Sequence, residues 1–196
     1  MPNWCWTRIT INADRNRLKS FENKLTEWTS KNYKENGFGL NWLGNVVGNS
    51  QIGTVDENKD TDLRCRGSIT YTDNLGDQFV IDTETAWAPM LKMWAKLVEK
   101  YIPNAELIYT AEESGCALYS TNDLQYKDKY IIDPWDIDDM EPDYEASKEL
   151  VVSVLQDLLN TTETDIDNLL DLLSLSSYSD KIGIHAWEFQ EIDVWE

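Results

Sequence analysis

The chain has 196 residues, and 41% of them are hydrophobic, which is enough to build a packed core and excludes a wholly disordered protein. Its 36 acidic residues outnumber 17 Lys and Arg residues, so the formal net charge is −19. Nucleic-acid affinity rests on Lys and Arg side chains that displace counterions, so this balance argues against direct nucleic-acid binding. No apolar run approaches about 20 residues, and we therefore expect no membrane-spanning helix.

The negative charge is concentrated towards the end of the sequence. Residues 1–132 hold 18 acidic and 15 basic residues, whereas residues 133–196 hold 18 acidic residues against Lys148 and Lys181 alone. This shift predicts two domains, 1–132 and 133–196. It also favours a basic protein as the partner of the second domain.

The cysteines indicate a reducing compartment. Cys5, Cys65 and Cys116 are far apart and odd in number, and no Cys-x-x-Cys pair is present. We predict no disulfide, no zinc site, and reduced thiols that pack in strands as small hydrophobes. The opening MPNWCWTRIT also lacks the basic and apolar stretches of a secretory signal, which predicts a cytoplasmic protein.

The first third of the sequence predicts a strand, a helix and a loop. Residues 4–11, WCWTRITI, alternate strictly between two faces, as a half-buried strand does. Residues 15–31 predict a helix, and residues 37–62, with five glycines, predict a long loop with a little local structure around LNWLGNVV. The apolar stripe of the helix is Leu18, Phe21, Leu25 and Trp28.

The next part completes a recognisable order of elements. Strands 64–72 and 78–84 are joined through DNLGD, which is typical of a hairpin. A helix is predicted over residues 89–101, and two strands within 106–119. The order β-α-β-β-α-β predicts an α+β class protein with a ferredoxin-like split βαβ fold, in which one antiparallel sheet carries both helices on one face.

Residues 133–196 predict an acidic, mainly helical extension that ends in an extended segment. Two helices are expected, the second with Thr162 as its N-cap. Their apolar stripes need something to bury against, so we expect the extension to dock on the first domain or on another chain. The stripes are Leu150, Val151, Val154, Leu155 and Leu158, then Ile166, Leu169, Leu170 and Leu173.

Three segments, MPNWC, TETAWAPMLKMWAKL and YTAEESGCALYSTND, together resemble the YubB-like proteins of phages, plasmids and integrative elements. The resemblance covers about residues 1–132 and implies a ferredoxin-like domain. It also implies an accessory protein of a mobile element, acting in the bacterial cytoplasm. The chain departs from the family by carrying Ser114, where relatives tend to have Pro, and by its acidic extension.

Several residues that could carry chemistry fit plainer roles better. His185 is the only histidine and has no Ser or Cys at a triad spacing, which favours a packed or capping role in the last strand. Glu112, Glu113 and Asp123 lie near strand ends, but neighbouring strand residues point to opposite faces, which favours a solvated loop edge over a metal site.

Trp4, Trp6 and Arg8 share one strand face, as the base-stacking residues of RNA-binding sheets do. The flanking basic and aromatic residues of such sheets are missing, and the net charge opposes nucleic acid. We therefore predict that the two tryptophans are core residues, covered by the acidic extension.

The stretch DPWDIDDMEPDYE, residues 133–145, has seven carboxylates and no cation. It is not an EF-hand loop, because Met140 and Glu141 stand where a ligand and the obligatory Gly belong. Duplex DNA presents about one negative charge per ~1.7 Å, and carboxylates along a helix rising ~1.5 Å per residue offer a comparable line. The predicted partner-binding residues are Asp136, Asp138, Asp139, Glu141, Asp143, Glu145, Glu163, Asp165, Asp167 and Asp171.

We therefore predict a non-enzymatic, cofactor-free inhibitor of a host defence nuclease, of the anti-CRISPR or antirestriction kind. Its acidic half would occupy a Lys/Arg-rich groove that normally binds nucleic acid. One alternative is an adaptor of the mobile element that binds protein through Trp187, Phe189 and Trp195. Another is a small-ligand or enzymatic module on the ferredoxin-like sheet. Only the mimic must lose affinity steeply as salt screens the groove.

Overall fold

The computed structural model describes residues 3–35, 37–55, 63 and 65–192. The chain forms two compact units, one of residues 1–122 with 190–196 and one of residues 123–189. The boundary expected between residues 132 and 133 falls inside strand β6, Tyr130–Pro134.

The first unit is built on a sheet of strand order β2-β3-β1-β4-β5-β9. Strands β1 to β5 of this sheet belong to residues 1–122, whereas the short strand β9, Glu188–Phe189, is the last segment of residues 123–189. The other elements are β1 (Trp4–Asn12), α1 (Arg15–Thr29), α2 (Leu43–Ser50), β2 (Gly67–Asn74), β3 (Gln78–Ala86), α3 (Leu91–Tyr101), β4 (Glu106–Glu113), the 3₁₀ turn η1 (Ser114–Cys116) and β5 (Leu118–Thr121).

The alternation of the first strand is the one predicted. Strand β1 pairs antiparallel with β3 and β4, and its buried face consists of Cys5, Thr7, Ile9 and Ile11. Asp14 begins α1 by accepting a hydrogen bond from the Arg17 amide at 3.1 Å. The hairpin between β2 and β3 turns at Gly76, whose φ of +104° strongly favours glycine.

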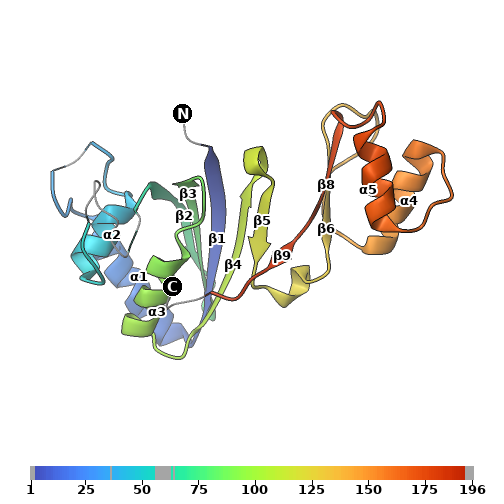
Figure 1. The fold of residues 1–196 in the computed structure, drawn as a ribbon. Coiled ribbons are helices and arrows are strands. Elements are labelled where there is room, and N and C mark those ends of the chain that lie inside the picture. The colour runs from blue at the N-terminus through green and yellow to red at the C-terminus, as the bar shows by residue number, and fades with distance from the viewer. Residues whose placement is uncertain (1–2, 36, 56–62, 64, 193–196) are drawn as a thin grey trace. The chain divides into compact units, whose positions relative to one another are not determined.

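All three helices of this unit lie on one side of its sheet (Figure 1). The predicted stripe of α1, Leu18 to Trp28, is buried there with Trp94 and Leu97 of α3. The loop expected at residues 37–62 contains helix α2, which adds Leu43, Val46 and Val47 to the same core.

The second unit contains a separate sheet of strand order β7-β6-β8. Strand β6 pairs antiparallel with both neighbours, and its Ile132 packs with Val151, Leu155 and Leu169 of the two helices. The other elements are the 3₁₀ turn η2 (Leu124–Tyr126), β7 (Asp143–Ala146), α4 (Lys148–Leu159), α5 (Ile166–Ser174) and β8 (Ile182–Ala186).

The prediction of a simple ferredoxin-like sheet with a helical extension is wrong. Within the described residues the first sheet has six strands, and the second unit has a three-stranded sheet of its own with α4 and α5. Strand β6 finds its partner β8 some fifty residues later, a pairing that leaves no local signal in either short segment. The N-cap prediction is also wrong, because α5 begins at Ile166 and Asp165, not Thr162, caps it.

None of the helices in the described parts of the chain is long and apolar enough to cross a membrane.

Candidate protein-interaction surface

The acidic stretch ahead of α4 forms the loop between β6 and β7, and part of β7. Asp136, Asp138, Asp139 and Glu141 are exposed in the loop. Asp136 lies 3.6 Å from the Lys181 ammonium, and both side chains are accessible to solvent, so this ion pair contributes little to stability.

The rest of this stretch is held by hydrogen bonds. Asp143 lies on β7 and accepts a bond from the Glu145 amide at 2.8 Å. Glu145 in turn accepts a bond from the Gln125 side-chain amide at 3.2 Å. These contacts fix the backbone and leave Glu145 exposed, so the carboxylates at this end of the loop have a defined position.

The second group of predicted acids lies at the start of α5, and only Asp167 and Asp171 are inside the helix. Asp165 accepts bonds from the amides of Asp167 and Asn168, both at 3.1 Å. Glu163 accepts bonds from the amides of Asp165 and Thr164, and these bonds lower the pKa of its carboxyl. Two of the four predicted contact residues therefore also shape the helix start.

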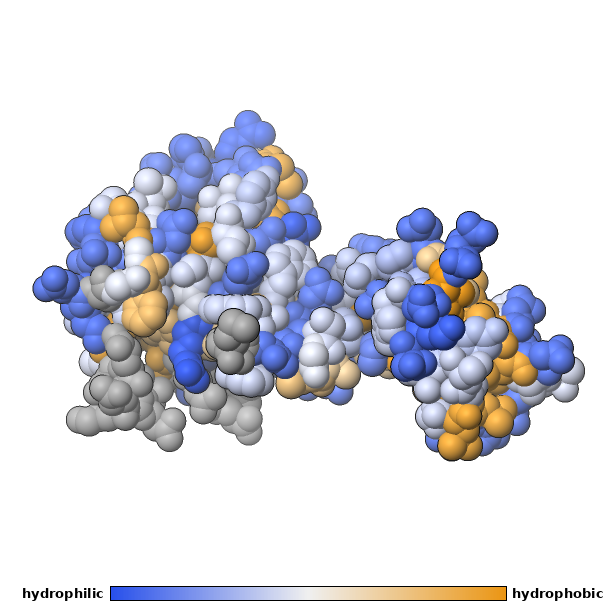
Figure 2. Space-filling view, turned by 90° about the horizontal axis from the view of Figure 1, so that it is seen from above, coloured by the Kyte–Doolittle hydropathy of each residue, from blue (hydrophilic) through white to orange (hydrophobic). Residues whose placement is uncertain are grey.

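Charge distinguishes the second unit more than any single carboxylate does. It contains 17 Asp and Glu and only four Lys, a formal net charge of −13, which leaves −6 for the first unit. Figure 2 shows hydrophilic residues over much of one face of this unit, with apolar residues between them. Fields of this sign and density attract basic partners and repel phosphates.

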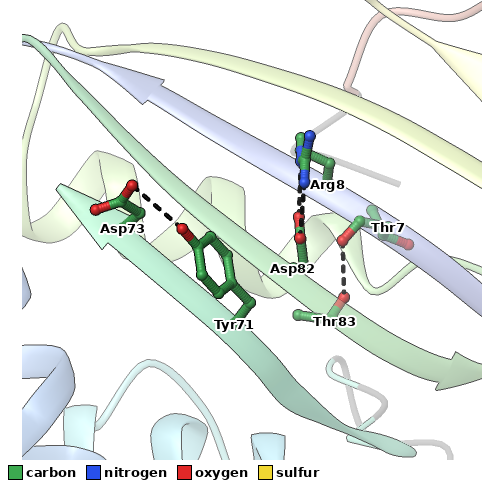
Figure 3. A network of polar contacts seen from close by, with 6 residues as sticks. All are labelled: Thr7, Arg8, Tyr71, Asp73, Asp82 and Thr83. Carbon is green, nitrogen blue, oxygen red and sulfur yellow. Dashed lines mark hydrogen bonds and ion pairs between the residues drawn. The ribbon is translucent and has the colours of Figure 1, made fainter. Parts of the chain in front are cut away.

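The face of the first sheet opposite the helices is accessible, and it carries a polar network (Figure 3). Arg8 forms a bidentate ion pair with Asp82, both bonds being 2.8 Å long, and the Arg8 Cζ lies 5.2 Å from the centre of the Trp6 ring. On the edge strand, the Tyr71 hydroxyl lies 3.2 Å from the Asp73 carboxylate. That carboxylate raises the pKa of the Tyr71 hydroxyl.

The prediction that Trp4 and Trp6 are core residues is wrong. Trp4 is 57% exposed and Trp6 is half-buried. Strict alternation correctly assigns these residues to the face opposite Cys5, but alternation does not say which face of a sheet is covered. No sequence motif predicted the Arg8–Asp82 ion pair, because the two residues come from strands more than seventy residues apart.

The three acids near the ends of β4 and β5 do not meet. Glu112 lies directly across from Trp6 on the open face, whereas Asp123 accepts the Gln125 amide at the start of η2. Glu113 is buried and accepts the Gly115 amide at 2.9 Å. Burial alone would raise the pKa of Glu113, but hydrogen bonds from Cys116, Gly115 and Asn3 hold it below its usual value.

All three thiols are free, but only Cys5 packs in a strand as predicted, since Cys65 lies just ahead of β2. Cys5 and Cys65 are buried, and burial raises the pKa of Cys65 to about 11. Cys116 is exposed on η1 beside Glu113, whose carboxylate raises the pKa of the thiol. A raised pKa disfavours the reactive thiolate form of Cys116.

His185 lies on β8, half-buried, two residues from Gly183. A side chain on Gly183 would overlap His185 and Trp135, so the glycine makes room for both rings. Burial lowers the pKa of His185, and the nearby Asp133 carboxylate opposes that shift. These contacts match the packing role predicted for this histidine.

The proposed adaptor residues are only partly available. Trp187 is buried and its indole N–H donates to the Tyr144 carbonyl at 2.8 Å. Phe189 is exposed, with the Lys127 ammonium 5.6 Å from its ring centre, and Trp195 lies outside the described residues.

Among the described residues, no three His, Cys, Asp or Glu side chains are grouped closely enough to hold a metal ion. Compared with protein-family models, curated proteins and solved structures, the chain matches none. The resemblance to the YubB-like proteins therefore stays a prediction.

Proposed function

We propose that the protein is a non-enzymatic inhibitor whose acidic second unit occupies the Lys/Arg-rich groove of a host nucleic-acid-binding protein, such as a defence nuclease. The observation that carries this proposal is the charge of −13 on the second unit, with most of the predicted carboxylates at its surface. The setting of a mobile element in a bacterial cytoplasm comes from the resemblance of the first 132 residues.

Two carboxylates of the acidic loop are held in place by hydrogen bonds, which supports mimicry of nucleic acid over a surface that is merely soluble. Bonds from the Gln125 side chain and from the Glu145 amide hold the carboxylates of Glu145 and Asp143 before any partner arrives. Ordering flexible side chains on binding costs about 0.5–1.5 kcal/mol each, so a preformed surface binds more tightly than a loose one of equal charge. The burial of Trp187 disfavours the adaptor.

The test is a pull-down from bacterial lysate at low salt, eluted with duplex DNA and analysed by mass spectrometry. The tested variant changes Asp136, Asp138, Asp139 and Asp143 to Asn, and Glu141 and Glu145 to Gln. We expect the parent chain to capture a nuclease that duplex DNA displaces. We expect the variant to capture no such nuclease. Several exposed ion pairs worth ~0–1 kcal/mol each together amount to orders of magnitude in affinity.

A matched control neutralises six exposed acids of the first unit by the same chemistry: Glu27, Glu35, Asp77, Glu99, Glu106 and Glu191. It changes the net charge of the chain by the same amount, and we expect it to retain the captured nuclease. Equal loss in both variants would show that total charge alone governs binding. A captured nuclease that duplex DNA cannot displace would contradict groove mimicry.

A further inference from the structure

The open face of the first sheet places tryptophan rings beside carboxylates. Trp6 lies directly across from Glu84 on β3 and from Glu112 on β4, and Trp4 is the next residue along the same face of β1. Directly opposed side chains on neighbouring strands have Cβ atoms about 4.5–5.5 Å apart, so rings and carboxylates meet here. Trp4 and Glu84 are exposed to solvent.

The molecule itself shows which group suits such a surface. The Arg8 guanidinium packs over the Trp6 ring and at the same time forms two 2.8 Å bonds with Asp82. A guanidinium is planar and weakly hydrated, so it stacks on an aromatic ring and pairs with a carboxylate more readily than an ammonium does. Trp4 and Glu84 present the same two kinds of group at the accessible end of this row.

The charge of the open sheet face limits which class of partner can bind there. The described open-face positions of β1 to β4 contain one basic residue, Arg8, which pairs with Asp82. The acidic residues of this face are Asp73, Asp82, Glu84, Glu106 and Glu112. A second copy of the chain, and nucleic acid, both bring negative charge to a negative face and are disfavoured. A basic segment of another protein is complementary to it.

We propose that Trp4, Trp6 and Glu84 form a docking site for an arginine side chain on a basic segment of a partner protein. The arginine stacks on the exposed indole of Trp4 and pairs with the Glu84 carboxylate, as Arg8 does with Trp6 and Asp82. This surface belongs to the first unit and is separate from the acidic loop of the proposed function, so either can fail without the other.

The probe is a peptide of about ten residues that alternates Arg and Ser, with a second peptide carrying Gln in place of Arg. Binding to the full chain is followed through the indole N–H resonances of Trp4 and Trp6 at about 0.3 M salt, where long-range attraction to the acidic second unit is screened. We expect the Arg peptide to shift both resonances and to bind at least about tenfold more tightly than the Gln peptide.

Two exposed substitutions test the residues without disturbing the core. Trp4→Ser and Glu84→Gln are each expected to weaken binding of the Arg peptide by about five- to tenfold. Their matched controls are Trp135→Ser and Glu99→Gln, since Trp135 is 58% exposed against 57% for Trp4 and Glu99 is exposed like Glu84. The controls should bind the peptide as the parent does.

Each alternative occupant gives a distinct result that would overturn the proposal. Equal binding of the Arg and Gln peptides would mean that no cation is recognised. A single-stranded oligonucleotide that shifts the Trp4 and Trp6 resonances would make the face a base-stacking platform. A dimer in solution that Trp4→Ser converts to monomer would make it a self-interface. Unchanged affinity of both Trp4→Ser and Glu84→Gln for the Arg peptide would show that the peptide binds elsewhere. The variant with six neutralised acids in the loop should bind the Arg peptide as the parent does.

Discussion

The two units of this chain differ in the size of their hydrophobic cores and in their net charge. Among the described residues, the first unit buries 24 apolar side chains in one cluster, and the second buries eight. The second unit is nevertheless the more highly charged, at −13 against −6. Its smaller core must therefore withstand more electrostatic self-repulsion than the core of the first unit does.

Substitutions in the two hydrophobic cores should change the free energy of unfolding most. Phe21 packs edge-on against Trp28 and Phe79, and Phe21→Ala should lower the free energy of unfolding of the first unit by about 3–5 kcal/mol. Leu169→Ala should lower the free energy of unfolding of the second unit by about 2–5 kcal/mol. Urea unfolding followed by circular dichroism measures both.

A surface control, Leu75→Ala, removes a 57% exposed side chain and should change stability by less than about 0.5 kcal/mol. If Leu169→Ala leaves the transition of the second unit unchanged, the eight-residue core does not hold that unit together.

The next effect concerns the open sheet face. Asp82 is buried on that face, and Arg8→Met would leave its carboxylate without the bidentate partner, at a cost of about 1–3 kcal/mol. Thermal unfolding of Arg8→Met, of Asp82→Leu and of the double variant measures the coupling. The exposed Lys31–Glu27 pair serves as the control, and its loss should cost only ~0–1 kcal/mol.

A smaller effect separates folding from binding in the acidic unit. Asp165 caps α5, so Asp165→Ala should destabilise the second unit by about 1 kcal/mol, while Asp165→Asn, which keeps the accepting oxygen, should cost only a few tenths. Chemical denaturation measures the stability, and the pull-down measures the partner. Under the proposed function, Asp165→Asn folds normally and loses only a little affinity.

The smallest effect is a pH dependence confined to the second unit. Burial lowers the pKa of His185 below its usual 6.5, so the folded state favours the neutral ring. Its contribution is fully present above pH 6.5 and is lost as the pH falls through the lowered folded pKa. The unfolding free energy of the parent should therefore fall more steeply below pH 6.5 than that of His185→Asn. Identical slopes would mean that the histidine is not desolvated.

Local patterns predicted most elements of the first unit. The alternation of residues 4–11, the stripe from Leu18 to Trp28 and the turn signal ending at Gly76 each depend on neighbours within a few residues, and all three are found in the structure. The candidate site is harder to predict. The carboxylate content of residues 133–145 was enough to predict the acidic loop. The Arg8–Asp82 ion pair could not be predicted, because no periodicity links two strands so far apart in the sequence.

Local sequence patterns were enough to predict the two faces of β1, the stripe of α1, and the concentration of negative charge in the second half. Three features could be known only from the folded chain: the Trp4 face is open, β6 pairs with β8, and Asp165 caps α5. The physical reason is range. Side-chain periodicity and turn chemistry act between near neighbours, whereas strand pairing, and the choice of which face to bury, depend on segments brought together only when the whole chain folds.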